Sequence, residues 1–211
     1  MTSTLKVNNI QDVKTLTIGD ATAEDTKIVF DGNAQDFHIG LDDSTDSLTI
    51  GLGSTLGTTS HMVIDANGHI TKPLQPAFCV QRDSSQDNIA TDTATDIQFE
   101  AERFDIGSNF ASNTFTAPIT GKYQLNANIR LNNLDTASAY YIIQLVTSNK
   151  TYFSIIAPST FTGDVGYFTL NMAVLADMDA SDTAKVQFLQ SGGTAQTDVD
   201  TPSNFSGYLV A

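Results

Sequence analysis

Large aromatic residues recur at short intervals in the second half of the chain, and their spacing limits the possible folds more than any other feature. Phe99, Phe110, Phe115 and Tyr123 lie 11, 5 and 8 positions apart, and Phe205 opens the last apolar run. Each lies in a short alternating stretch that ends at Asn, Ser, Gly or Thr. Alternation with a period of two places such rings on one face of a β-sheet. The pattern predicts a sheet core built from successive strands.

Further apolar runs of strand length complete this half of the chain. Pro118 restricts the residue before it and Gly121 is free to adopt a positive φ, so a turn is expected between them. Helical periodicity is absent, and the predicted fold class is all-β. The expected strand regions are residues 113–123, 140–146, 165–172, 184–189 and 205–210.

The order and spacing of these aromatic residues resemble the globular head of complement-recognition proteins, within the tumour-necrosis-factor-like jelly rolls. The resemblance covers residues 77–211 and includes the closing run Phe205-Ser206-Gly207-Tyr208-Leu209. It implies a C-terminal jelly-roll β-sandwich and a homotrimer, because heads of this kind are typically trimers around a threefold axis. Leu125 and Ala127 stand where the family prefers aromatic residues, so the core is expected to be smaller there.

The first seventy or so residues carry a second pattern, a series of short strands with similar sequences. The centres Ile18, Val29, Ile39 and Ile50 follow one another at steps of 11, 10 and 11 residues, which is typical of a ladder of hairpins or a stacked β-repeat. Strands with so few large apolar residues form a weak core alone, whereas three chains side by side would bury their Ile and Leu faces. The expected runs are residues 16–20, 27–32, 37–42, 48–52 and 62–65.

These patterns predict the domain organisation. Residues 1–72 are expected to form an N-terminal particle-attachment segment and β-repeat stalk, and residues 77–211 the jelly-roll head. Residues 73–76 form a proline-containing joint, since prolines restrict the backbone.

Composition excludes several classes of partner and location. There are 24 acidic residues against 10 Lys and Arg, a formal charge of −14, which disfavours nucleic acid and anionic membrane surfaces. The start of the chain has no apolar signal-peptide region, and no later run is long enough to span a bilayer. The single cysteine, Cys79, excludes an internal disulfide and is interpreted as a small buried apolar residue.

The N-terminal sequence carries a second resemblance. Residues 3–12 (STLKVNNIQD) and 22–37 (TAEDTKIVFDGNAQDF) resemble phage tail-fibre and virion-appendage proteins, particularly those of marine and cyanobacterial phages. The resemblance implies that the N-terminus attaches to other virion proteins of the capsid or tail. It also implies that the head faces outward at the virion surface, where it could bind a glycan or protein of the host, after synthesis in the host cytoplasm.

The residue types needed for catalysis are scarce, so the chain is not expected to be an enzyme. The only histidines are His38, His61 and His69, and none belongs to a zinc-binding His-Glu-x-x-His motif. His38 alternates with apolar neighbours and is expected to be a solvated or hydrogen-bonded surface residue. A polysaccharide-degrading enzyme with paired carboxylates stays open as an alternative, although no pair stands out.

Carboxylates crowd into the loops, where they could bind a hard cation such as calcium. The strongest candidate ligands are Asp177, Asp179 and Asp182, and related heads bind calcium near the trimer apex. The other interpretation is a solvated acidic loop that favours solubility.

The resulting functional hypothesis is a trimeric phage virion structural protein. As a tail or head fibre it would present the head to the host, with contacts through loops such as residues 160–166 or 192–201. The alternative is a capsid decoration or cement protein at threefold positions. A bacterial adhesion module is a third class.

Overall fold

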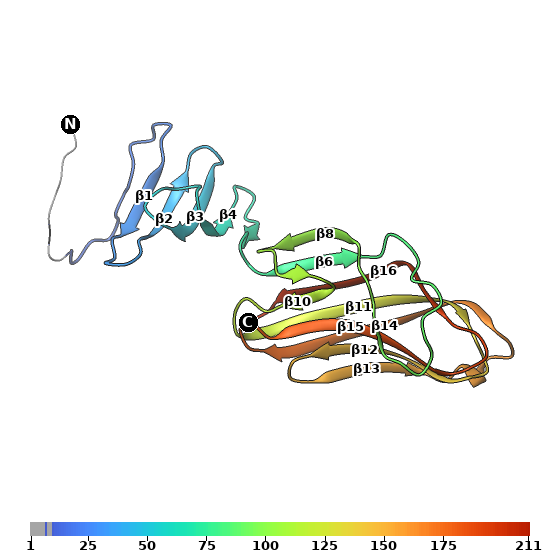
Figure 1. The fold of residues 1–211 in the computed structure, drawn as a ribbon. Coiled ribbons are helices and arrows are strands. Elements are labelled where there is room, and N and C mark those ends of the chain that lie inside the picture. Colours follow the sequence, from blue (N-terminus) through green and yellow to red (C-terminus); the bar gives the residue numbers. More distant parts are fainter. Residues whose placement is uncertain (1–6, 8–9) are drawn as a thin grey trace. The chain divides into compact units, whose positions relative to one another are not determined.

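The computed structural model describes Val7 and residues 10–211, which fall into two units, Met1–Pro73 and Leu74–Ala211 (Figure 1). Residues 1–6, 8 and 9, which hold most of the first phage-like stretch, lie outside the described residues. The prediction of an all-β fold is confirmed, because strands make up the regular structure of the described residues apart from one 3-10 helix, η1 (Pro158–Thr160). No helix in this part of the chain has the length and apolarity needed to cross a membrane.

The N-terminal unit is an antiparallel sheet in which each strand pairs with the next along the chain. The predicted strand at residues 16–20 is wrong, because no neighbouring strand satisfies the backbone groups of this exposed segment in the described structure. The five strands are β1 (Thr26–Phe30), β2 (Phe37–Asp42), β3 (Ser47–Leu52), β4 (Ser60–Ile64) and β5 (Ile70–Thr71).

This sheet buries its polar face and exposes its apolar face. In β2 the small and polar residues are buried, and the apolar residues that alternate with them are exposed. The loop after β3 covers the polar face: Leu56 is 5% exposed, and its Cδ1 lies 3.0 Å from where a Cβ on Gly40 would be. His38 is hydrogen-bonded, with its Nδ1 2.9 Å from the Gly53 carbonyl oxygen, but the expectation of a surface residue is wrong because this side chain is 0% exposed.

The head is a sandwich of two antiparallel sheets (Figure 1). The first sheet has the order β14 (Val165–Met178), β11 (Gly121–Leu134), β16 (Asp198–Leu209), β6 (Ala77–Gln81) and β8 (Ala101–Ile106). The second has the order β13 (Thr151–Ile156), β12 (Ser138–Thr147), β15 (Thr183–Gly192), β10 (Thr114–Thr116) and β9 (Phe110–Ala111), with β7 (Thr95–Asp96) paired to β15.

The aromatic residues that the spacing singled out fill the space between these sheets. The rings of Phe78 and Phe115 stack with centroids 4.6 Å apart, and Phe205 meets Phe78 edge-on at 4.9 Å. Tyr123 is 0% exposed and its hydroxyl donates a hydrogen bond to the Ile119 carbonyl at 2.7 Å. The predicted aromatic core is confirmed.

Gly207, near the end of β16, packs against the core with no room for a side chain. A Cβ there would lie 2.6 Å from Leu125 Cδ2, 2.8 Å from Phe78 Cε1 and 3.1 Å from the Gln124 carbonyl oxygen. We expect Gly207→Ala to lower the free energy of unfolding by about 1–3 kcal/mol through overpacking, measured by urea denaturation. The control is Gly163→Ala, where a Cβ meets nothing within 4 Å. Equal effects of the two substitutions would contradict this prediction.

Candidate functional sites on the head

The three aspartates predicted to bind calcium lie in and beside the turn between β14 and β15. Asp177 forms an ion pair with Lys122, while Asp182 Oδ2 accepts hydrogen bonds from the Asp179 N–H at 2.9 Å and from Asn149 Nδ2 at 2.8 Å. Within the described residues, no three His, Cys, Asp or Glu side chains group closely enough to hold a metal ion. The structure thus brings Asp179 and Asp182 together through a hydrogen bond, and pairs Asp177 with a lysine.

This acidic turn lies at the end of the head where the chain enters it. Gly121 and Met178 are Cα partners here, and the Lys122 N–H donates to the Ala211 carbonyl at 2.7 Å. The loops of residues 135–137, 157–164 and 193–197 lie at the opposite end of the same strands. The acidic turn therefore lies at the end of the head that is next to the joint.

The calcium site stays a prediction, and a melting experiment tests it. Calcium bound only to the folded protein must raise its melting temperature by mass action. For an occupied site, millimolar calcium raises the melting temperature of the wild type, EGTA reverses the rise, and the double variant Asp179→Asn, Asp182→Asn shows neither change. A wild-type melting temperature that neither calcium nor EGTA changes would show that the turn is a hydrogen-bonded structure without calcium.

At the opposite end of the head, the Asp135 carboxylate links two loops. It is 4% exposed, and it accepts hydrogen bonds from the N–H groups of Ala195 and Ala137, both at 2.8 Å, and from the Thr194 hydroxyl at 3.1 Å. The hydrogen bond from Ala195, followed by that from Ala137, holds the pKa of Asp135 below its ordinary value of 3.8. This carboxylate therefore fixes the β15–β16 loop against the β11–β12 turn.

Tyr141 and Gln190 extend this buried polar cluster. The Tyr141 hydroxyl accepts hydrogen bonds from the Asp135 N–H at 2.8 Å and from the Thr197 hydroxyl at 2.9 Å. Gln190 Oε1 accepts from the Thr197 N–H at 2.9 Å, and its Nε2 donates to the Ala195 carbonyl at 2.7 Å. Because the cluster is fully hydrogen-bonded in this way, it rigidifies the loops at this end of the head. Sequence reasoning missed it, since these residues come together only through the strand register.

A small pocket opens beside this cluster. Its volume is about 290 Å³, and its lining includes Asn133, Asp135, Asp164 and Ala195. Asp164 Oδ1 accepts hydrogen bonds from the Thr136 N–H at 2.9 Å and from its hydroxyl at 2.8 Å. Carboxylate and amide groups in the lining of a pocket suit ligands with hydroxyl groups.

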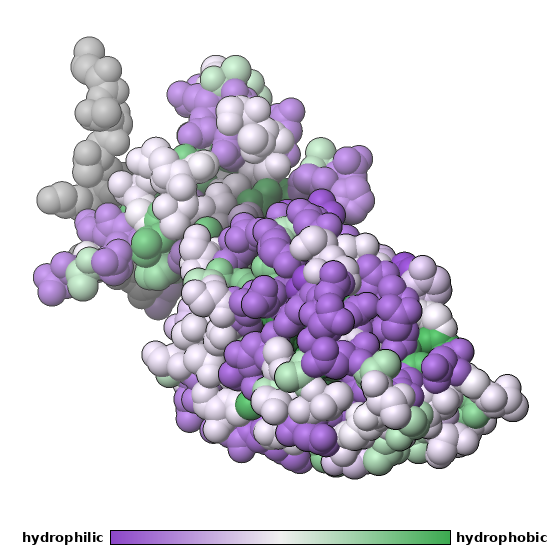
Figure 2. All heavy atoms as spheres, turned by 45° about the vertical axis from the view of Figure 1, so that its right-hand side comes forward, coloured by the Kyte–Doolittle hydropathy of each residue, from purple (hydrophilic) through white to green (hydrophobic). Residues whose placement is uncertain are grey.

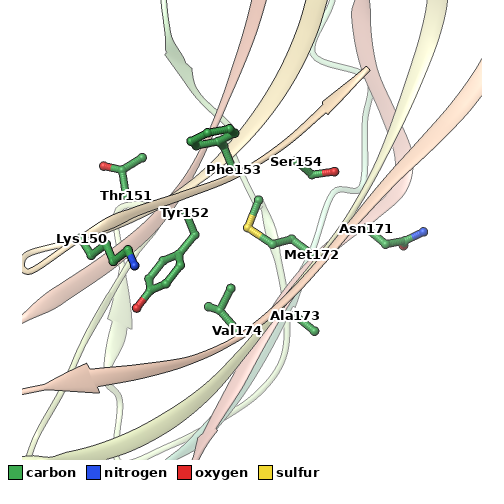
Figure 3. Close-up of a pocket in the computed structure, with 9 residues that line it drawn as sticks. All are labelled: Lys150, Thr151, Tyr152, Phe153, Ser154, Asn171, Met172, Ala173 and Val174. Carbon is green, nitrogen blue, oxygen red and sulfur yellow. The ribbon is translucent and has the colours of Figure 1, made fainter. Parts of the chain in front are cut away.

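The edge strands β13 and β14 leave the sandwich open on one side (Figure 3). The groove between them has a volume of about 480 Å³. Figure 3 shows Tyr152, Met172 and Val174 pointing into the groove, and these side chains pack against the core. Phe153 points to the other side of β13 and is 65% exposed, and Lys150 Nζ lies 5.1 Å from the Tyr152 ring centroid. The edge is therefore apolar and without a cover within the described chain.

The outward face of the β14–β11–β16 sheet, which is the face directed away from the core of the sandwich, is rich in amides. Asn128 of β11 has Asn171 and Asn204 as its Cα partners on either side. Exposed large residues border these amides: Tyr167 is 61%, Leu175 57% and Tyr208 50% exposed. The surface visible in Figure 2 is mostly hydrophilic or intermediate in hydropathy, with apolar residues in separate patches. Amides with exposed aromatic residues are a composition that suits a protein interface.

Cys79 also lies on the outward side of this sheet. It is paired with Ser206 and is half-buried, whereas its neighbours Phe78 and Val80 are each 1% exposed. The interpretation of Cys79 as a buried core residue is wrong, because strand alternation turns it away from the core.

Comparison with known families identifies the head. A family model described as "C1q domain" matches residues 77–210, which is more than half of the chain. The chain belongs to the C1q family. The predicted jelly-roll head is thereby confirmed. Domains of this family form homotrimers and are typically binding modules.

Two solved structures illustrate the similarity of the C1q head. The globular domain of zebrafish complement 1qA is 12% identical, with a TM-score of 0.48, and the match covers 65% of this chain and 98% of that one. Murine APRIL at pH 8.0 is 10% identical, with a TM-score of 0.46, and the match covers 64% of this chain and 99% of that one. A search of curated proteins found no match. The family assignment rests on the match to the C1q domain.

Proposed function

We propose that this protein is a homotrimeric surface appendage of a bacteriophage virion, without enzymatic activity. The N-terminal unit attaches to capsid or tail proteins, and the C1q head faces outward and binds a glycan or protein of the host surface. The observation that carries the proposal is the combination of a C1q head, residues 77–210, with a small N-terminal sheet in one chain. The virion assignment is supported by the resemblance of residues 3–12 and 22–37 to phage appendage proteins.

The surfaces of the head support the homotrimer. The open β13–β14 edge is apolar, with Tyr152 and Met172 in its groove. The outward face of the β14–β11–β16 sheet carries amides together with the exposed Leu175 and Tyr208. These two surfaces differ, so a contact between the edge of one chain and the sheet of the next is heterologous, and repeated around a threefold axis it closes into a ring of three chains. Three copies then cover all three apolar edges.

The outward end of the head supports host binding. The acidic turn lies at the joint end, so the loops of residues 135–137, 157–164 and 193–197 are those at the free end. The buried Asp135 fixes two of these loops, and the 290 Å³ pocket lies beside it. Part of the expected contact loop 192–201 is strand, since β16 begins at Asp198. A rigid, polar site of this kind suits a surface glycan.

Capsid decoration is the second candidate function, and the size of the N-terminal unit favours it. The five strands of this unit lie between Thr26 and Thr71, and β5 has only two residues. A unit of this size suits a short appendage or a cement protein at threefold positions of a capsid better than a long fibre.

Immunogold electron microscopy of purified phage particles, with an antibody against residues 77–211, tests this function. We expect gold on projections from the tail or head vertices. Gold spread evenly across the capsid faces would establish decoration instead. Particles without gold would overturn both virion roles, and gold on prophage-free bacterial cells would favour an adhesion module.

A further inference from the structure

The N-terminal sheet exposes one face that is apolar across all its strands. Ile28, Ile39, Ile50 and Met62 are successive Cα partners from β1 to β4. Cα partners in an antiparallel sheet carry their side chains on the same face, so these four residues form a continuous central row. The rows on either side of it are also apolar, Phe30, Phe37 and Leu52 on one side and Leu41, Leu48, Ile64 and Ile70 on the other. We call these eleven residues the apolar face.

The apolar face is large for a surface exposed to water. Seven of its residues are between 36% and 62% exposed: Ile28, Phe30, Phe37, Ile39, Leu41, Leu48 and Ile70. With roughly 200 Å² for each whole residue, their exposed area is about 700 Å², above the ~300–600 Å² of the largest patch on a typical monomer. Each partner of a standard protein interface buries about 800 Å². The face is therefore large enough to be one side of a stable interface.

The charge of the N-terminal unit restricts what can cover this face. Residues 10–73 hold ten Asp and Glu against three Lys, and no residue of the apolar face is charged. The loop that contains Leu56 covers the opposite face of the sheet. An anionic lipid surface or a nucleic acid is repelled by this unit. The partner must therefore present an uncharged apolar surface of similar size.

We propose that the apolar faces of three copies of this chain pack together and form a three-sided β-prism. The proposal rests on the homotrimer of the proposed function, because the trimeric heads hold three N-terminal sheets in one assembly. Only residues 72–76 separate β5 from β6, and so short a connection keeps the three sheets at an effective concentration in the millimolar range. Around a threefold axis each sheet turns one face inward, so the prism closes and covers all three apolar faces.

Cross-linking of the full-length protein tests the prism. In a Cys79→Ser background, Ile39→Cys places one thiol at the centre of the apolar face, and Val29→Cys places one on the opposite face of the same sheet. Val29 is a matched control because it is 37% exposed, compared with 36% for Ile39. With a short bismaleimide, we expect Ile39→Cys to give covalent dimers on a denaturing gel, since one thiol per chain joins two chains. Val29→Cys should stay monomeric on the same gel.

The outcomes separate this inference from the proposed function. Light scattering is measured on both variants before cross-linking, and Leu41→Cys, at a residue that is 47% exposed, repeats the test at a second position on the face. A trimer mass without cross-links at Ile39 and Leu41 would overturn the prism and leave the trimeric head standing. A monomer mass would overturn the homotrimer and the prism together. Flotation with neutral phosphatidylcholine vesicles, without cross-links, would replace the prism by a membrane contact.

Discussion

Phe205→Ala is expected to lower the free energy of unfolding of the C1q head by about 3–5 kcal/mol. Phe205 is 0% exposed, and its ring centroid lies 4.9 Å from that of Phe78 and 6.1 Å from that of Phe99. Truncation removes the apolar contacts of a buried ring and leaves a cavity between two sheets that cannot close fully. Urea denaturation followed by circular dichroism measures the loss.

Ile119→Ala is the control for this substitution. Ile119 lies in the turn before β11 and is 53% exposed, so its truncation should change the free energy of unfolding by less than about 0.5 kcal/mol. Both variants are measured at the same protein concentration, because a trimer is stabilised by mass action. A loss for Phe205→Ala no larger than that for Ile119→Ala would contradict the aromatic core described above.

Asp135→Asn is expected to lower the free energy of unfolding by about 2–3 kcal/mol at pH 7, because charge-assisted hydrogen bonds to two loops are lost. The N–H groups of Ala195 and Ala137 lower the pKa of Asp135 from 3.8. The folded protein thus binds the Asp135 proton more weakly than the unfolded chain does. The stabilisation is therefore complete above the ordinary carboxyl pKa and is lost as the pH falls through the lower folded-state pKa.

The expected signature is a difference in stability between wild type and Asp135→Asn that is constant from pH 7 to about pH 5 and shrinks in more acidic solution. Melting temperatures at a series of pH values measure it. The exposed Glu102 provides the control, and Glu102→Gln should follow the wild type closely at neutral pH. A difference for Asp135→Asn that stays the same down to pH 2 would show that the carboxylate charge does not stabilise the head.

The head was largely predictable because its aromatic residues repeat with the period of a strand and pack on one side. Phe115, Tyr123 and Phe205 are each at most 1% exposed, as the alternation requires. The buried charge was not predictable. Arg82 is 1% exposed and pairs with Glu100 at 3.1 Å, although charged residues are usually on the surface and the partner lies 18 positions away. Burial lowers the pKa of Arg82, and Glu100 opposes that shift.

The N-terminal unit was predictable only in part, because its burial depends on a loop. Local alternation placed β1 to β4 within a few residues, yet the similar run at residues 16–20 remained unpaired. Alternation also placed His38 on the face away from Ile39, but the sequence showed no sign that Leu56 folds back over that face. The positions of Asp177 and Asp182 in the acidic turn were predictable from the sequence. Their partners, Lys122 and Asn149, were not, because these contacts depend on the register between segments far apart in the sequence.

The homotrimer is the claim on which the head contacts, the virion role and the prism all depend. Sedimentation velocity of the full-length protein at micromolar concentration tests it most directly. We expect a single species of three 22.6 kDa chains, about 68 kDa in all, that does not dissociate on dilution. A species with the mass of one 22.6 kDa chain across the same concentrations would contradict it.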